Sequence, residues 1–293
     1  MNPFDAIIIG AGPAGAQCAL WLKQLGHDPC LIESGSQAGG LLCNNPYPIS
    51  GLACLGEQLT GQQLATGLQA TLHASQVCLK TSQHVSRISR YNDQYQVESI
   101  TATGVTMLQT RHVVIASGVK PRTGGLPASE NILFGPGQQV YSHDWRGLRV
   151  AILGGGDNAF ENFLFIRDRH ARSVHLFARN ILARQQFRKR VPAQAVSVGE
   201  YQVDASHCAV NQQQFDRIVV MYGWEPRLDF TIDGVLRVNS QGFVSTSPDS
   251  CETSLTNLFA IGEVAGRQHP CCATAMADGV VAAKAILARL EAG

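Results

Sequence analysis

Short apolar runs alternate with helix-periodic segments along this chain. The run Ala6–Ile9 predicts a buried strand, the apolar spacing through residues 16–25 predicts a helix that stops at Gly26, and Pro29–Ile32 predicts a second strand. A strand, a helix and a second strand in this order are typical of a parallel βαβ unit. We therefore expect the N-terminal segment to begin an α/β fold.

The same order of elements returns roughly 144 residues downstream. Arg149–Leu153 predicts a strand, Phe160–Arg169 a helix and Ser173–Phe177 the next strand. A repeated architecture on this scale predicts two similar α/β units within one chain.

The remaining segments read mostly as strands. Further strands are expected at Gln76–Leu79, Val85–Ser89, Tyr95–Val97, Val105–Leu108, His112–Ile115, Arg217–Met221 and Leu258–Ala260. An amphipathic helix is expected from Gly56 to Leu72, a turn at residues 223–226, and an alanine-rich helix from about Ala273 to Leu290. The 293 residues are enough for two domains, each with its own core.

Composition limits the partners and the compartment that we expect for this protein. Lys and Arg total 23 against 22 for Asp and Glu, so the charge balance indicates neither a nucleic acid nor an anionic membrane as a partner. No apolar run approaches the roughly 20 residues that span a bilayer, and no basic stretch with a cleavable apolar segment opens the chain. Nine cysteines at irregular spacings, without a C-x-x-C, favour free thiols in a reducing compartment. We expect a soluble, cytoplasmic protein without a metal site.

A glycine-rich turn joins the first predicted strand to the first helix. Gly10 permits the sharp turn, Gly12 lets the backbone approach a pyrophosphate, and Gly15 lets the helix pack close to the strand. The phosphates would rest on the helix N-terminus. Glu33 would accept hydrogen bonds from an adenosine ribose, and its charge would repel a 2′-phosphate, which favours FAD or NAD over NADP. The alternative is a structural βαβ turn that binds nothing.

Two further segments are expected to border the same ligand. The loop that closes on Gly39-Gly40-Leu41 suits backbone that turns around a flat ligand, with an ordinary surface loop as the alternative. The strand that ends at Ala116-Ser117-Gly118 meets a small-residue turn, where backbone can approach a cofactor closely. The binding residues predicted for this first site are Gly10, Gly12, Pro13, Ala14, Gly15, Glu33, Gly39, Gly40, Leu41, Ala116, Ser117 and Gly118.

The second βαβ segment repeats the turn as G-x-G-x-x-A. Its predicted binding residues are Gly154, Gly156, Asp157, Asn158 and Ala159. At the end of the next strand an arginine, Arg179, replaces the acid of the first site, and Arg184 follows. Guanidinium groups pair well with a phosphate monoester, so this site favours NADPH, with NADH possible. The alternative is that the arginines form a solvated helix face.

With these residues in place, the whole chain resembles the thioredoxin-reductase-like branch of the flavin-dependent pyridine nucleotide-disulfide oxidoreductases. The resemblance rests on four ordered motifs, namely Gly10/Gly12/Gly15 with Glu33, Ala116-Ser117-Gly118, residues 154–159, and Phe259-Ala260-Ile261-Gly262-Glu263. It implies two Rossmann-like domains, with an NAD(P)H domain of residues 120–241 inserted into an FAD domain of residues 1–119 and 242–293, and a homodimer. It also implies that flavin contacts come from Gly262, Glu263, Arg267, Gln268, Thr274 and Ala275.

Three departures from the family pattern qualify this resemblance. Relatives that reduce thioredoxin carry a C-x-x-C followed by Asp before the second nucleotide turn, whereas residues 140–144 here read Val-Tyr-Ser-His-Asp. Both cysteines are absent, so the usual relay from flavin to a dithiol is excluded. Glu263 stands where the family usually has Asp, and Arg179 with Arg184 matches only part of the family's arginine set.

Several residues are candidates for chemistry beyond cofactor binding. Hydride transfer from nicotinamide to flavin needs alignment rather than a protein nucleophile. Cys271 and Cys272, at the start of the last helix, are candidates for a substitute redox centre, as are Cys43 and Cys54; inert cysteines are the alternative. His143 with Asp144 is a candidate acid–base pair, with a surface turn as the alternative.

Two functions remain open on the sequence. The first is an FAD-dependent NAD(P)H oxidoreductase that passes electrons to an unidentified small-molecule or small-protein acceptor. The second is a non-catalytic flavoprotein that senses redox state or NAD(P)H. Two intact nucleotide sites favour the enzyme, because a nicotinamide site beside a flavin site serves hydride transfer.

Overall fold

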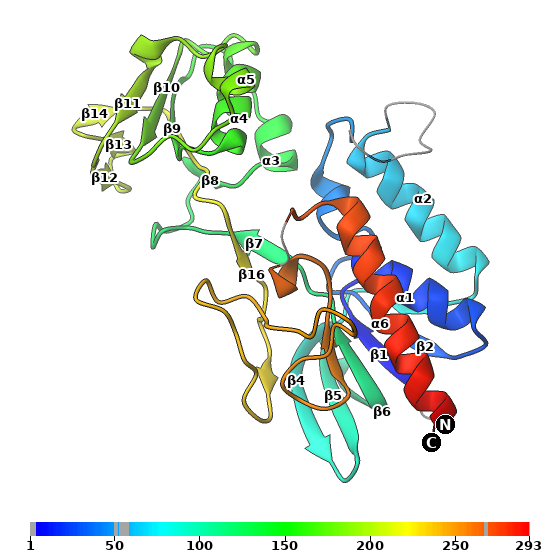
Figure 1. Ribbon diagram of the computed structural model, residues 1–293. Helices are drawn as coiled ribbons and strands as arrows, with labels where there is room; N and C mark the ends of the chain where they lie inside the picture. Colours follow the sequence, from blue (N-terminus) through cyan, green and yellow to red (C-terminus); the bar gives the residue numbers. More distant parts are fainter. Residues whose placement is uncertain (1–3, 50–51, 53–58, 267–268, 293) are drawn as a thin grey trace. The chain divides into compact units, whose positions relative to one another are not determined.

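The computed structural model describes residues 4–49, 52, 59–266 and 269–292. The chain forms two compact units (Figure 1). The first unit combines the N-terminal part, up to Val119, with the part from Glu225 onward, and the second unit is Lys120–Trp224. The predicted α/β fold class is confirmed, because each unit is built on a sheet with parallel strands and covering helices.

The first unit contains an eight-stranded sheet with the order β17-β4-β5-β6-β1-β2-β3, in which β18 also pairs with β6. Strands β1, β2, β3 and β18 run parallel to the C-terminal half of β6, and β4, β5 and β6 form an antiparallel meander. Because parallel strands end at the same edge, the turns after β1, β2, β6 and β18 lie together there. The strands are β1 (Phe4–Ile9), β2 (Pro29–Ile32), β3 (Cys78–Lys80), β4 (His84–Tyr91), β5 (Gln94–Thr101), β6 (Gly104–Ile115), β17 (Thr231–Ile232) and β18 (Leu258–Ala260).

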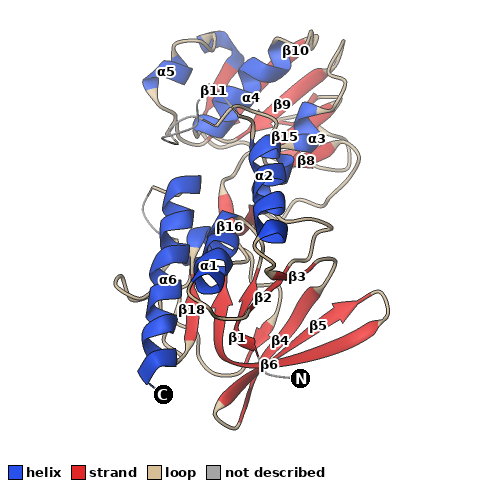
Figure 2. Ribbon diagram, turned by 90° about the vertical axis from the view of Figure 1, so that its right-hand side faces the viewer, coloured by secondary structure: helices blue, strands red, loops and turns tan. Residues whose placement is uncertain are grey.

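The two faces of this sheet bury alternate residues of each strand. Ile8 belongs to the core shared with α1 (Pro13–Gln24), α2 (Gly61–Ala74) and α6 (Cys272–Ala292). Its neighbours Ile7 and Ile9 face the opposite way, into a core that β4 and β5 complete. Figures 1 and 2 show α1 and α6 side by side against the sheet. Short 3-10 helices occupy Gly40–Asn44 and Gly262–Ala265.

Helix α6 approaches α1 closely at Gly279. A Cβ added to Gly279 would stand 2.5 Å from the carbonyl oxygen of Ala14 and 2.8 Å from the backbone nitrogen of Cys18. Only glycine allows the two helix backbones this separation. Gly279 therefore sets how closely α6 approaches the first turns of α1.

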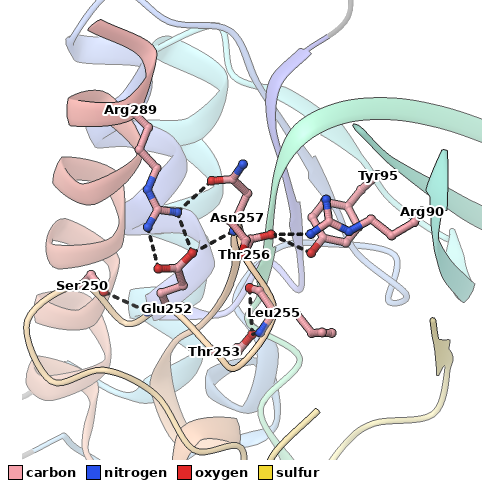
Figure 3. A network of polar contacts seen from close by, with 9 residues as sticks. All are labelled: Arg90, Tyr95, Ser250, Glu252, Thr253, Leu255, Thr256, Asn257 and Arg289. Carbon is pink, nitrogen blue, oxygen red and sulfur yellow. Dashed lines mark hydrogen bonds and ion pairs between the residues drawn. The ribbon is translucent and has the colours of Figure 1, made fainter. Parts of the chain in front are cut away.

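A polar network holds the loop that leads into β18 (Figure 3). The guanidinium of Arg289, near the end of α6, donates to both carboxylate oxygens of Glu252 and to the side-chain oxygen of Asn257. On the other side of this loop, Tyr95 and Arg90 both donate to the carbonyl oxygen of Thr256, at 2.8 and 2.9 Å. The loop is thus tied to α6 and to the meander, which fixes the entry of β18.

The second unit contains a five-stranded parallel sheet with the order β11-β10-β9-β15-β8. Apolar clusters fill both faces of this sheet, and α4 packs against β9 and β10. Three short antiparallel strands extend the unit, and β7 pairs with β16 where the chain passes between the units. The elements are β7 (Val119–Pro121), β8 (Ile132–Phe134), α3 (Gln138–Tyr141), β9 (Arg149–Leu153), α4 (Asp157–Arg167), β10 (Ser173–Ala178), α5 (Gln185–Arg188), a 3-10 turn (Ala193–Ala195), β11 (Val196–Val198), β12 (Val203–Asp204), β13 (Ala209–Val210), β14 (Gln213–Gln214), β15 (Arg217–Val220) and β16 (Trp224–Pro226).

Three details differ from the sequence-based expectations. Residues 225–241 pack with the first unit and not with the second, because Leu228, Phe230 and Ile232 join its meander core. Gly104–Ile115 is one strand where two were expected, since its first half pairs with β5 and its second half with β1. The expected turn at residues 223–226 includes the strand Trp224–Pro226.

Candidate functional site

A cavity of about 460 Å³ opens in the first unit, at the carboxyl edge of its parallel strands. This is the edge where ligands bind in open α/β sheets. The cavity brings together turns that follow β1, β2, β6 and β18, which are far apart in the chain. Its lining includes thirteen of the predicted binding residues, namely Gly10, Gly12, Pro13, Ala14, Glu33, Gly40, Leu41, Ala116, Ser117, Gly118, Gly262, Glu263 and Ala275.

The three glycines of the first turn differ in the space around them. A Cβ on Gly10 would stand 2.3 Å from the carbonyl oxygen of Ala116, and one on Gly15 would stand 2.0 Å from the carbonyl oxygen of Gly10. Both positions therefore serve packing within the fold. For Gly12, by contrast, the one described atom within 4 Å of an added Cβ is the Cα of Gly40, at 3.9 Å. Its open side faces the cavity, beside the N-terminus of the 12-residue helix α1.

Glu33 is a buried acid at the end of β2. Its Oε2 accepts a hydrogen bond from the backbone N–H of Ala11 at 2.8 Å, and its Oε1 accepts one from that of Gly35 at 2.7 Å. The carboxylate thereby joins the glycine turn to the loop that follows β2. One side of this carboxylate lines the cavity, where it can accept further hydrogen bonds from hydroxyl groups.

Gly262 and Glu263 follow β18 and also line the cavity, where a Cβ added to Gly262 would stand 2.9 Å from the Cβ of Ala14. Gly262 has a φ of 72°, and its N–H donates to Oδ2 of Asp278, at 3.0 Å. Asp278 is a buried acid in α6 that sequence reasoning missed; its only signal was a charged residue on the apolar face of the last helix. Burial raises the pKa of Glu263, whose side chain lies on the cavity wall.

The paired cysteines lie at the start of α6, where Cys271 precedes the helix and Cys272 is its first residue. The thiol of Cys271 is exposed and lies 3.5 Å from Oγ1 of Thr274. This contact, and a hydrogen bond between the thiol and the backbone of Thr274, lower the pKa of Cys271. Burial raises the pKa of Cys272, and Cys271 and Glu263 add to that effect. Neither cysteine lines the cavity, whereas Cys43 does. Three predicted residues, Arg267, Gln268 and Cys54, lie outside the described residues.

The second glycine turn has a comparable geometry within the second unit. A Cβ on Gly154 would meet the carbonyl oxygen of Met221 at 2.3 Å, and one on Gly155 would meet that of Asn180 at 1.9 Å. Gly156 has no atom of the described part of the chain within 4 Å of an added Cβ, and it precedes the N-terminus of α4. The open glycine beside a helix N-terminus therefore recurs here.

The two predicted arginines of the second unit lie in different environments. Arg184 is bound to Asp157 at the start of α4, through its backbone N–H at 2.7 Å and its Nε at 2.5 Å, although its side chain is 72% exposed. Arg179 is exposed at the end of β10 and lies near a pair of tyrosines, whose hydroxyls are 3.0 Å apart. These tyrosines, Tyr201 and Tyr222, were not among the predicted residues, and no sequence motif marks them.

His143 and Asp144, the candidate acid–base pair, each have another neighbour as their main partner. Asp144 accepts two side-chain hydrogen bonds from Arg146, at 2.7 and 2.9 Å, and this ion pair lowers the pKa of Asp144 to about 2. The ring of His143 packs on Trp145 instead, with 4.5 Å between the ring centroids. An arginine two residues away competes better for the carboxylate than the neighbouring imidazole does.

No helix among the described residues has the length and apolar character that crossing a membrane requires.

Comparison with known proteins agrees with the geometry. A family model for pyridine nucleotide-disulphide oxidoreductases matches residues 4–279. The chain is 26% identical to the bifunctional thioredoxin reductase/thioredoxin of Mycobacterium leprae over 95% of its own length, and it spans 64% of that protein. It is 28% identical to a ferredoxin–NADP reductase of Lactococcus lactis subsp. cremoris, over 80% of this chain and 73% of that one.

Solved structures show the same fold. The crystal structure of Lactococcus lactis thioredoxin reductase in its FR conformation superposes with a TM-score of 0.80 at 21% identity, covering 99% of this chain and 100% of that one. The predicted resemblance is therefore confirmed: this chain belongs to the pyridine nucleotide-disulphide oxidoreductase family, and it is an FAD-dependent NAD(P)H oxidoreductase.

Proposed function

We propose that FAD binds in the cavity of the first unit and that NADPH binds at the glycine turn of the second unit. Electrons then pass from the flavin to an acceptor, but not to thioredoxin by way of a C-x-x-C dithiol. The observation that carries this proposal is the cavity itself. It joins an open glycine at a helix N-terminus to a buried acid at the end of the second strand. This combination suits a pyrophosphate followed by a ribose.

The residues of the cavity fit FAD along its length. Gly12 and the N-terminus of α1 would hold the pyrophosphate, and Glu33 would accept hydrogen bonds from the adenosine ribose. Glu263 would bind the ribityl chain, and Ala275 would border the flavin ring. When bound, FAD supplies the hydride-accepting chemistry, which no side chain can provide. The protein's own part would be to hold the two cofactors in place.

The net positive charge of the second unit supports the proposal that this unit binds a nicotinamide nucleotide. Lys120–Trp224 contains 13 Lys and Arg and 8 Asp and Glu, a formal net charge of +5, although the whole chain carries +1. A positive unit attracts a polyphosphate nucleotide and raises its association rate. Exposed Arg179 at the end of β10 would pair with the 2′-phosphate, while Arg184 and Asp157 would brace the turn. We therefore propose NADPH as the preferred donor.

The acceptor is constrained by residues 140–144. These residues form the end of α3 and the turn after it, and they contain no thiol. A relay from flavin to a dithiol in the second unit has no sulfur to use there. We propose a small-molecule or small-protein acceptor that meets the flavin directly. The homodimer and the cytoplasmic location stay predictions.

Anaerobic titration of the yellow protein tests this proposal. Bleaching of the flavin band by NADPH at lower concentration than NADH is expected, and sustained NADPH consumption with one member of an acceptor panel would identify the acceptor. Stoichiometric reduction without turnover on any acceptor would favour a redox sensor instead. A purified protein that takes up no FAD on reconstitution would contradict the proposal that the cavity binds FAD.

A further inference from the structure

Two cysteines face each other across strands β2 and β3, away from the cavity. Cys30 and Cys78 are direct partners in the parallel register of these strands, and their sulfur atoms lie 3.9 Å apart. Neither belongs to the residues that line the cavity. The pairing of β2 with β3 thus places two thiols in contact that are 48 residues apart in the chain.

The two thiols differ in access. Cys30 is fully buried in the core that β4 and β5 complete, in the same cluster as Ile9 and Ile32. Cys78 is only partly buried, because β3 is the last strand at this end of the sheet. Small solutes can therefore reach Cys78, whereas Cys30 has no exposed surface.

Their surroundings also differ in electrostatics. The hydrogen bond with Cys30 and the charges of Lys80 and Lys23 lower the pKa of Cys78, against the effect of partial burial. The hydrogen bond with Cys78 and burial both raise the pKa of Cys30. One thiol of the pair is therefore prepared to react as a thiolate, and the other stays protonated beside it.

The backbone geometry permits a bond between them. Paired residues on neighbouring strands have their Cα atoms roughly 5 Å apart, which lies within the range that disulfides span. A rotation of the Cys78 side chain can bring the sulfurs from 3.9 Å to the bonding distance of about 2 Å.

We propose that Cys78 and Cys30 form a peroxide-reactive dithiol, a modification site separate from the cofactor cavity. The Cys78 thiolate attacks hydrogen peroxide, which breaks the O–O bond and leaves a sulfenic acid and one water after protonation. The Cys30 thiol then attacks the Cys78 sulfur, a disulfide forms, and a second water leaves. Two thiols lose two electrons in total, and one peroxide is reduced to two waters. This proposal does not depend on the acceptor or on FAD.

The site lies next to a residue that the proposed function uses. The N–H of Glu33, three residues after Cys30, donates to the carbonyl oxygen of Lys80 at 2.8 Å, two residues after Cys78. A cross-link between β2 and β3 therefore forms directly beside the segment that positions Glu33.

Differential alkylation of the intact, reduced protein tests the proposal. The protein is treated with one equivalent of hydrogen peroxide, alkylated, and digested with trypsin and Glu-C together. Both proteases are needed because the chain has no Lys or Arg between Lys23 and Lys80, while Glu33 and Glu57 separate the two cysteines. We expect a linked peptide pair two hydrogens lighter than the reduced peptides, and labelling of Cys78 about tenfold faster than that of a thiol of ordinary pKa.

Internal controls and variants make the outcome decisive. Cys18 and Cys251 are also buried neighbours, but neither is exposed, so both should stay reduced. In Cys30→Ser, dimedone should trap the sulfenic acid on Cys78; in Cys78→Ser, Cys30 should stay reduced. The wild-type measurement needs no variant to fold. Oxidation confined to exposed Cys271, with Cys30 and Cys78 still fully alkylated, would overturn the proposal.

Discussion

Substituting Gly12 by alanine separates cofactor binding from folding. Gly12 has a φ of −70°, which alanine adopts without strain, and its added Cβ would be 3.9 Å from the nearest atom, the Cα of Gly40. Among the described residues, no atom of the folded chain is therefore displaced. The new methyl group would instead occupy the cavity beside the N-terminus of α1, where we propose that the pyrophosphate of FAD lies.

The magnitude follows from the hydrogen bonds that the methyl group would block. A hydrogen bond to a charged group contributes roughly 1.5–3 kcal/mol, so losing two backbone contacts to phosphate costs about 3–6 kcal/mol. At about 1.4 kcal/mol for each factor of ten, the affinity for FAD should fall roughly 10²- to 10⁴-fold. The free energy of unfolding of the FAD-free protein should change by no more than about 1 kcal/mol, the usual difference between glycine and alanine at a helix N-cap.

Reconstitution measures both quantities. FAD binding is followed by quenching of flavin fluorescence, and stability by urea unfolding of the FAD-free protein. Gly67→Ala is a matched control, because Gly67 lies inside α2 with nothing within 4 Å of an added Cβ. That variant should gain about 0.5–1 kcal/mol of stability and keep its FAD affinity. Wild-type FAD affinity in Gly12→Ala would refute the assignment of the pyrophosphate to this turn.

Three further variants test other parts of the structure. In steady-state assays, Arg179→Ala should raise the KM for NADPH about tenfold or more and leave the KM for NADH nearly unchanged, because one charge-assisted contact to the 2′-phosphate is lost. Equal changes in both KM values would contradict the pairing of Arg179 with the 2′-phosphate. Gly279→Ala should destabilise the protein by roughly 1–3 kcal/mol in urea unfolding, because its Cβ would meet the backbone of α1; an unchanged midpoint would show that the helices can separate freely. Burial raises the pKa of Glu263 above its ordinary value of 4.5. Between these two pKa values the native state holds a proton that the unfolded state has released, so the FAD-free protein should lose stability as the pH rises through this range. Glu263→Gln should remove that part of the slope, and parallel stability–pH curves for variant and wild type would contradict it.

The sequence by itself determined the parts of this protein whose cause is local. Each glycine turn lies between a strand and a helix that are adjacent in the chain, so periodicity and residue type were enough to predict both turns. The same holds for Glu33, because the acid ends the strand that follows the first helix. The end of β2 was predicted at the residue where the structure has it, since an apolar run stops at a charge.

Only the tertiary structure decided which distant side chains meet. Local periodicity does not encode the partner of a buried polar group, so the bond from Gly262 to Asp278 and the pairing of Arg184 with Asp157 could not be predicted. In the same way, residues 225–241 joined the first unit because their apolar side chains complete the meander core. Cys30 and Cys78 meet because strand order is a property of the sheet, and the free energy that selects that order comes from burying whole faces.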